Sequence, residues 1–278
     1  MSGPPPVFTL GHSPDPDDAF MFYAMAEHKI DLRGYHFEHR LEDIQTLNER
    51  AMRGELHISA VSIHAYSYVA DRYALLPCGA SMGDGYGPLV VALADNIDLR
   101  TARIAVPGTM TSAFLALRLY LGDFQHVVVP FDRIFDTVRT GAADAGLIIH
   151  EGQLTYGQAG FVKILDLGEW WKAETGLPLP LGGNVLRKDI APAVQKDLLA
   201  ILRESIDYGL AHRDEAVRHS MPYARDMNEE LAGKFIGMYV NEFTRDYGDA
   251  GRAAIRRFLG EARARGLINA AVEPEFVG

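Results

Sequence analysis

The sequence predicts an α/β protein made of two lobes, and three observations point to this fold class. Strand-like and helix-like segments alternate over residues 7–73, which is the pattern of a parallel sheet covered by helices. A second alternation of the same kind covers residues 88–165. After Leu186 the patterns are mainly helical. We therefore expect one sheet in each lobe and a helical tail that packs back on the first lobe.

The first block contains three expected strands, each followed by an expected helix. The strands cover residues 7–11, 35–39 and 57–60. The first helix starts at Asp17 and has acidic residues in its first turn, where the helix dipole favours negative charge. The other two helices cover residues 43–53, closed by Gly54, and residues 63–73.

The second block and the tail complete the expected organisation. Expected strands cover residues 88–93, 102–106, 126–130, 145–149 and 161–165. Expected helices cover residues 111–121, 132–139, 192–212, 228–240 and 252–265. The chain is expected to cross between the lobes near residues 90–96 and to return near residues 179–186. The first lobe then consists of residues 1–92 with 186–278, and the second lobe of residues 93–185.

Composition and charge exclude several classes of protein. The 278-residue chain carries 27 Lys and Arg against 37 Asp and Glu, a formal net charge of −10. This acidity argues against nucleic-acid binding, which needs a basic surface to neutralise phosphates. The single cysteine, Cys78, excludes a disulfide framework and a multi-cysteine metal site. No apolar run approaches 18 residues and no secretory signal is recognisable, so we expect a cytoplasmic protein that does not insert into a membrane.

Hydroxyl side chains follow three of the expected strands, at the edge where ligands bind open α/β sheets. Ser13 lies in the loop at residues 11–18, Ser62 in the loop at residues 60–66, and Thr111 and Ser112 in the loop at residues 107–113. A hydroxyl beside the free N–H groups of a helix start can hold a carboxylate. The alternative for each residue is a simple helix cap. Asn184, on the expected return crossing, is a further candidate ligand contact.

His150 is the candidate for proton transfer. It ends an apolar strand and is followed by Glu151 and Gly152. Imidazole titrates near neutral pH, which makes histidine the usual proton-transfer group. The alternative is a structural histidine, although a position at the end of a strand facing the expected cleft favours catalysis. The chain has no H-E-x-x-H pattern, no G-x-S-x-G motif and no P-loop spacing, so no metal site, serine nucleophile or phosphate loop is expected.

Six motifs in a fixed order resemble the 1,4-dihydroxy-6-naphthoate synthase family of the futalosine route to menaquinone. They are SPDPDDAF at 13–20, VSIHAY at 61–66, PGTMTSA at 107–113, GLIIHEG at 146–152, LTY at 154–156 and PLPLGGN at 178–184. Each motif alone is weak, but the ordered set is specific and covers residues 8–190.

The resemblance implies a two-lobed fold like that of the type II periplasmic solute-binding proteins, here in a cytoplasmic enzyme without a metal or other cofactor. The implied reaction cleaves cyclic dehypoxanthinyl futalosine, a small anionic substrate, to 1,4-dihydroxy-6-naphthoate and dihydroxyacetone. By the same resemblance His150 is the general base. The substrate contacts that the resemblance implies are Ala60, Val61, Ser62, Thr111 and Ser112. Further candidate contacts are Ser13 in the first loop, Tyr156 in the LTY motif and Asn184 on the return crossing.

The chain departs from the family pattern at two places. Family members commonly carry Cys and Asn where this chain has Asp15 and Asp17, and many carry Lys where Ala60 stands. Without that lysine, the helix-start amides and hydroxyls must hold the substrate carboxylate. Two other functions are alternatives: a solute-binding protein for a small organic anion, and an enzyme similar to chorismate dehydratase, whose pattern lacks the His-Glu-Gly motif. A homodimer is compatible with the sequence.

Overall fold

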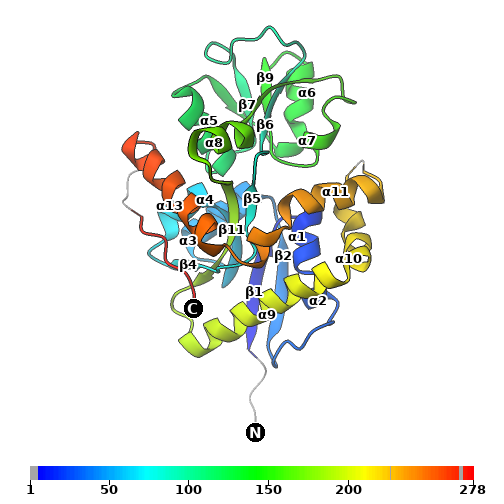
Figure 1. Cartoon of the computed structure of the whole chain (residues 1–278), viewed down its shortest axis with the longest axis vertical. Helices are drawn as coiled ribbons and strands as arrows, with labels where there is room; N and C mark the ends of the chain where they lie inside the picture. Colours follow the sequence, from blue (N-terminus) through cyan, green and yellow to red (C-terminus); the bar gives the residue numbers. More distant parts are fainter. Residues whose placement is uncertain (1–5, 226, 269–271) are drawn as a thin grey trace.

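The computed structural model describes residues 6–225, 227–268 and 272–278, which form two lobes with one sheet each (Figure 1). The first lobe holds a six-stranded sheet in the order β2-β1-β3-β11-β4, with β5 paired to β11. The second lobe holds a five-stranded sheet in the order β10-β6-β9-β7-β8. The expected α/β fold of two lobes is confirmed.

Parallel pairing in the first sheet brings the carboxyl ends of its early strands together. Strands β1 (Val7–His12), β2 (His36–Leu41) and β3 (Ile58–Ser62) are parallel. Strand β11 (Leu179–Arg187) runs antiparallel between β3 and β4 (Tyr73–Leu75), and also pairs with β5 (Ser81–Gly83). The loops after β1 and β3 therefore lie at one edge of this sheet.

The helices of the first lobe follow the expected pattern with two differences. They are α1 (Pro16–Met21), α2 (Tyr23–Ala26), α3 (Ile44–Arg53) and α4 (Ile63–Val69). Helix α3 begins where the Asp43 carboxylate accepts from the backbone of Gln45 and Thr46, and ends at Gly54 with φ +70°. The expected first helix is interrupted at Phe22. The expected helix over 63–73 is too long, because Tyr73 pairs with β11 and starts a strand.

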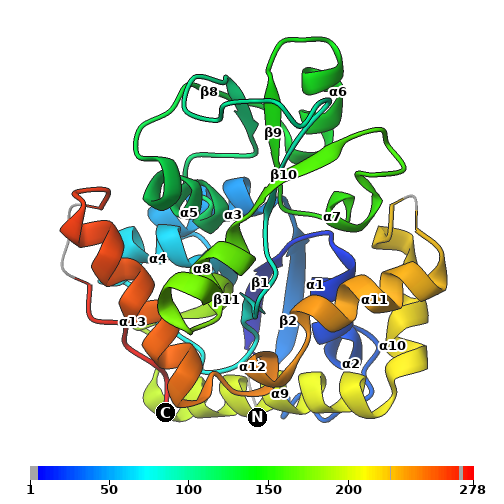
Figure 2. The same cartoon turned by 45° about the horizontal axis from the view of Figure 1, so that its top comes forward.

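The second sheet consists of β6 (Leu89–Ala92), β7 (Ile104–Val106), β8 (His126–Val128), β9 (Ala145–Ile148) and β10 (Val162–Asp166). Strands β7, β8 and β9 are parallel, and β6 is antiparallel to both of its neighbours, β9 and β10. Strand β6 therefore runs against the other four strands of this sheet. The helical segments of this lobe are α5 (Ser112–Leu121), the 3₁₀ turn η1 (Phe131–Arg133), α6 (Ile134–Arg139), α7 (Gly152–Thr155) and α8 (Leu167–Thr175). Figure 2 shows β8 and β10 at opposite sides of this sheet.

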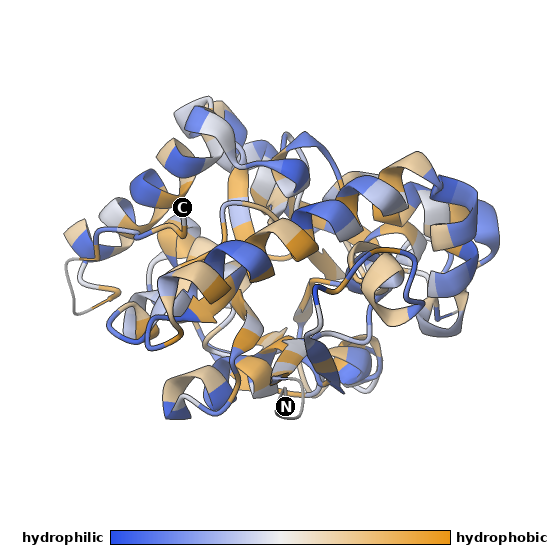
Figure 3. Cartoon of the chain, turned by 90° about the horizontal axis from the view of Figure 1, so that it is seen from below, coloured by the Kyte–Doolittle hydropathy of each residue, from blue (hydrophilic) through white to orange (hydrophobic). Residues whose placement is uncertain are grey.

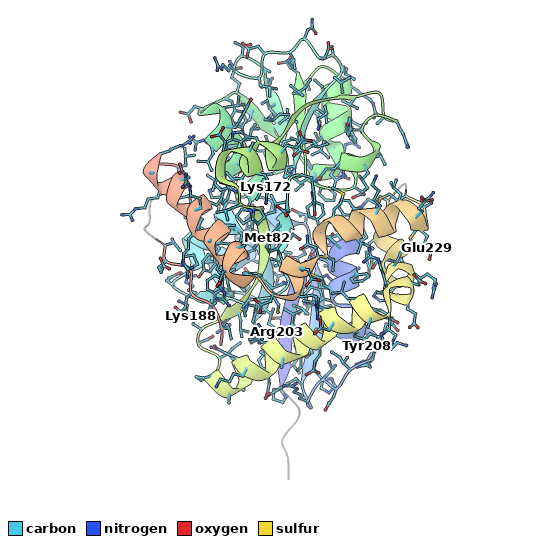
Figure 4. All side chains as sticks on the ribbon, viewed as in Figure 1. Met82, Lys172, Lys188, Arg203, Tyr208 and Glu229 are labelled. Atoms are coloured by element: carbon cyan, nitrogen blue, oxygen red, sulfur yellow. The ribbon has the colours of Figure 1, made fainter. Side chains whose placement is uncertain are left out.

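The C-terminal segment packs on the first lobe. It contains α9 (Pro192–Ala211), α10 (Arg213–Ser220), the 3₁₀ turn η2 (Met221–Tyr223), α11 (Glu229–Tyr239), α12 (Glu242–Arg245) and α13 (Gly248–Ala264). Helix α9, which carries Arg203 and Tyr208, crosses the base of the lobe (Figure 4). Its Ser205 hydroxyl donates to the carbonyl of Met21 at 2.7 Å. Helices α10 and α11 pack on α1, next to the loop that follows β1.

The core is continuous between the lobes. One buried cluster joins Val61 on β3 and Tyr66 on α4 to Val90 on β6 and Leu115 on α5. Figure 3 shows hydrophobic colour along the strands in the interior and hydrophilic colour on the outer turns of the helices. Burial of this shared apolar surface favours the packed arrangement of the two lobes.

The two connections between the lobes lie at earlier residues than the sequence boundaries suggest. Residues 89–92, assigned from sequence to the first lobe, pair in the second sheet, and residues 179–185, assigned to the second lobe, pair in the first. Tertiary pairing decides this, since periodicity does not identify the sheet. The connections touch at Gly168, where a Cβ would lie 1.8 Å from the carbonyl oxygen of Tyr86. Lys172 on α8 (Figure 4) pairs with Asp84 at 2.6 Å across the same junction.

Candidate active site

A cavity of about 120 Å³ lies between the lobes, at the ends of strands from both sheets. Its walls include most of the predicted contact residues, namely Ser13, Ala60, Val61, Ser62, Thr111, Ser112 and Asn184. The first lobe supplies the loops after β1 and β3 together with β11, and the second supplies the start of α5. The structure thus brings together loops that are far apart in the sequence.

The loop after β1 gives the cavity an acidic wall. Asp15, Asp17 and Asp18 all line it. The carboxylate of Asp18 accepts from the backbone N–H of Ser13 at 2.6 Å, and the Ser13 hydroxyl lies 2.8 Å from Asp18 and 2.9 Å from Asp15. The single Ser13 hydroxyl proton is therefore used inside the loop. Burial raises the pKa of Asp18 to about 6, and burial with the nearby Asp18 and Asp15 raises the pKa of Asp17 well above its ordinary value.

Asn48 on α3 fixes Ser62 at the end of β3. The Ser62 backbone N–H donates to Asn48 Oδ1 at 2.8 Å, and Asn48 Nδ2 donates to the Ser62 hydroxyl oxygen at 3.0 Å. Because the hydroxyl oxygen accepts from Asn48, its own hydrogen is available to a ligand. Asn48 is fully buried and was not among the residues singled out from sequence. The sequence gives only a weak indication of this role, because Asn48 is a single polar residue on the inward face of an amphipathic helix.

The start of α5 offers amide groups rather than hydroxyls. Thr111 Oγ1 accepts from the N–H of Phe114 at 3.1 Å and donates to the carbonyl of Gly108 at 3.0 Å, so this side chain is a helix cap. The Ser112 hydroxyl donates to the carbonyl of Leu181 at 2.5 Å. The N–H groups of Ser112 and Ala113 have no partner within the helix. These two amides, at the positive end of the helix dipole, are the part of the loop suited to a carboxylate.

Asn184 contributes a polar oxygen to the cavity. Its Nδ2 donates to the carbonyl of Gly79 at 3.0 Å, which fixes the orientation of the amide. Among the described residues, no group donates to its buried Oδ1. A ligand hydroxyl at this point would satisfy the acceptor, since an unpaired buried oxygen costs about 1–3 kcal/mol.

His150 lies in a smaller cavity beside the main one. The two cavities share Asp15, Ile44 and Ile149. Nδ1 of His150 accepts from the backbone N–H of Gly152 at 3.0 Å, so the ring proton is on Nε2, which lies 3.2 Å from the carbonyl of Phe131. Burial lowers the pKa of His150 below its ordinary value, so the ring is neutral near pH 7, the form a base requires.

Two further residues at the site escaped the sequence analysis. Tyr239 on α11 lines the main cavity and donates to Gln153 Oε1 on α7 at 2.5 Å. Arg225, between η2 and α11, lies 3.3 Å from Asp15 and 3.4 Å from Glu151. Both belong to the C-terminal segment, whose residues had no strand end or motif to mark them.

Comparison with known proteins places this site in a family. Residues 8–264 match the model of a family described as menaquinone biosynthesis. The chain belongs to this family. A 1,4-dihydroxy-6-naphthoate synthase of Thermus thermophilus is 41% identical over 96% of this chain and 98% of its own length. A protein of the same name from Streptomyces coelicolor is 40% identical, over 94% of each chain. The chain is thus an enzyme of a biosynthetic family.

Solved structures agree with this assignment and identify the fold. A crystal structure of an Archaeoglobus fulgidus protein has a TM-score of 0.92 and 46% identity, covering 94% of this chain and 98% of that one. An alkanesulfonate-binding protein of Xanthomonas axonopodis pv. citri, bound to MOPS, has a TM-score of 0.71 but only 11% identity, covering 97% and 96%. The menaquinone biosynthesis family member therefore has the fold of periplasmic binding proteins.

Tyr156 is the one predicted contact that this family member's structure does not bring to either cavity. It follows α7 and packs against the second-lobe cluster that contains Phe161 and Ile148. The short helix turns the side chain toward this apolar core.

The part of the chain that the structure describes has neither a cluster of metal-ligating side chains nor a membrane-spanning helix. No group of three or more His, Cys, Asp or Glu side chains there could hold a metal ion. None of its helices has the length and apolarity needed to cross a membrane.

Proposed function

We propose that this chain is a carbon–carbon lyase that cleaves cyclic dehypoxanthinyl futalosine to 1,4-dihydroxy-6-naphthoate and dihydroxyacetone in the cytoplasm. The observation that carries the proposal is the main cavity, whose lining includes both the helix-start residues Ser112 and Ala113 and the acidic residues of the loop after β1, with His150 in the cavity beside it. The relatives named 1,4-dihydroxy-6-naphthoate synthase, at 40% and 41% identity over nearly their whole length, support it.

The two walls suggest one orientation for the substrate. Its carboxylate would accept from the N–H groups of Ser112 and Ala113 at the start of α5. The hydroxyl-rich three-carbon portion would point toward the carboxyl groups of Asp17 and Asp18, which accept hydrogen bonds from hydroxyls. The reverse orientation would place the substrate carboxylate beside the carboxyl groups of Asp17 and Asp18, which repel it whenever they are ionised. The bond to be cleaved then lies on the side nearer His150.

His150 would act as the general base that triggers release of the three-carbon fragment. Its neutral ring can take a proton, and Nδ1 is the nitrogen with a lone pair. To do so, Nδ1 must exchange the N–H of Gly152 for the substrate's proton. A small rotation of the ring into the space shared by the two cavities would achieve this.

Turnover of cyclic dehypoxanthinyl futalosine, followed by chromatography of the naphthoate product, tests the proposal. Wild type should form 1,4-dihydroxy-6-naphthoate, and His150→Asn should lose most of this activity while its melting temperature stays close to that of wild type. His126→Asn, an exposed histidine on β8, is the matched control and should remain active. If His150→Asn turned the substrate over as fast as wild type, His150 would not be the general base, although the proposed reaction would stand.

A solute-binding function is the second candidate, because periplasmic binding proteins share the fold. It predicts saturable binding of the substrate without product from wild type. That outcome, measured by calorimetry alongside the chromatographic assay, would replace the lyase by a binding protein for a small organic anion.

A further inference from the structure

We infer that Arg225 is a positioning residue that latches the two lobes together and holds the loop carrying His150 in place. This inference rests on the proposed function, because it concerns how the proposed base is positioned. Arg225 lies in the first lobe, between η2 and α11, outside the lining of the main cavity. It does not face the substrate, and its effect must therefore pass through other residues.

The guanidinium joins carboxylates from the two lobes. Its Nη1 lies 3.3 Å from Asp15 Oδ1, in the first-lobe loop after β1, and 3.4 Å from Glu151 Oε1, in the second lobe after β9. Its Nη2 donates to the carbonyl of Pro14 at 3.1 Å. Three attachments from one planar group fix its direction more firmly than a single ion pair would.

The same side chain contacts both supports of His150. Glu151 is the residue next to His150, and its Oε2 lies 3.6 Å from His150 Nδ1. On the other side, the Arg225 guanidinium carbon lies 4.9 Å from the ring centroid of Phe131, whose carbonyl accepts from His150 Nε2. Arg225 therefore holds the two segments between which the imidazole is suspended.

The charges around the latch explain why a cation is needed there. Glu151 is 5% exposed, and burial together with the nearby charge of Asp15 raises the pKa of its carboxyl, whereas Arg225 lowers it. Removing the guanidinium would leave Asp15 and Glu151 to repel each other across the cleft. Glu151 would then either move away or take up a proton, and both changes would displace the His150 loop.

Steady-state kinetics of Arg225→Met, Arg225→Lys and Glu151→Gln test the inference. For Arg225→Met we expect kcat to fall about tenfold, equivalent to about 1.4 kcal/mol, with KM changed less than about threefold. Arg225→Lys should recover part of kcat because it restores the charge but not the planar fork. The double variant Arg225→Met/Glu151→Gln should be no slower than the slower single variant, because both remove one interaction.

Arg213→Met is the matched control. Arg213 also lies in the C-terminal segment, donates to a carbonyl (Gly233, 2.9 Å) and stacks over a phenyl ring (Phe20, 5.7 Å), but all its contacts are within the first lobe. The kcat of Arg213→Met per folded molecule should equal that of wild type. Equal kcat for Arg225→Met and wild type, or the same loss in both arginine variants, would overturn the latch. Absence of turnover in wild type would instead overturn the proposed function.

Discussion

The backbone N–H of Gly152 donates to Nδ1 of His150 at 3.0 Å. This contact sets the tautomer of the ring, because an accepting Nδ1 leaves the proton on Nε2. It also occupies the lone pair that a general base must offer. The geometry of the Gly152 backbone therefore bears directly on the readiness of His150 for proton transfer.

Gly152→Ala should reduce turnover by displacing the imidazole. A Cβ at this position would lie 2.8 Å from Cε1 of His150 and 3.0 Å from Cε2 of Phe135, both closer than carbon atoms normally approach. The ring must shift, and a displaced catalytic group can cost about 100-fold in rate. We expect kcat to fall between about tenfold and about 100-fold, measured by naphthoate formation.

Gly157→Ala is the control for this substitution. It lies shortly after α7, and nothing lies within 4 Å of its added Cβ. Its activity should match wild type. If Gly152→Ala were as active as Gly157→Ala, the position of His150 would not limit the reaction.

Thr111→Ala should weaken both the fold and substrate binding. The side chain caps α5 through the N–H of Phe114, and loss of such a cap costs about 1 kcal/mol of unfolding free energy. The adjacent amides of Ser112 and Ala113 would lose their fixed direction, so KM should rise severalfold. Urea unfolding and steady-state kinetics measure the two effects. Thr111→Ser keeps the hydroxyl and should retain the wild-type unfolding free energy and KM. Equal KM values for Thr111→Ala and Thr111→Ser would show that the amides of Ser112 and Ala113 do not bind the substrate.

Three histidines behind the first loop should make the protein sensitive to acid. Burial and the neighbouring His39 lower the pKa of His12 to about 3, and burial lowers the pKa of His39 and His219. A lowered histidine pKa means that stability is full above the unfolded value of 6.5 and is lost as the pH falls toward 3. His12 alone should remove about 3 kcal/mol of unfolding free energy between pH 7 and pH 4.

Unfolding by urea across this pH range measures the effect. His12→Gln should have a flatter stability profile between pH 7 and pH 4 than wild type. His36→Gln, at an exposed position on β2, should leave the profile unchanged. Parallel profiles for wild type and His12→Gln would show that His12 does not carry the acid sensitivity.

The sequence allowed prediction of those parts of the site that depend on residues close together in the chain, such as helix caps and the loops that follow strands. The α3 cap at Asp43 and Gly54 follows from residue type and spacing, and the loops with Ser62 and Thr111 follow strands that periodicity identifies. Strand β11 could not be predicted in this way. Its Pro-Leu-Gly-Gly stretch is typical of a connection, and it is a strand because β3 and β4 bind it from both sides.

The hydrogen-bond partners of the side chains at the site could not be predicted from the sequence either. Residue type suggested Thr111 and Ser112 as hydroxyl donors to a ligand, but both donate within the protein. Arg225 meets partners 210 and 74 residues away in the chain, and no local pattern marks such contacts. Arg225 reaches these partners because the C-terminal helices pack on α1.

Asp17→Asn should stabilise the protein, and more so at higher pH. Burial with Asp18 and Asp15 nearby raises the Asp17 pKa well above 3.8, so wild type loses stability as the pH rises above 3.8 and through the folded value. The amide never ionises. We expect the melting temperature of Asp17→Asn to exceed that of wild type at pH 8 and the gain to shrink toward pH 4. Asp71→Asn, at an exposed site, is the control; a gain independent of pH would contradict the charge argument.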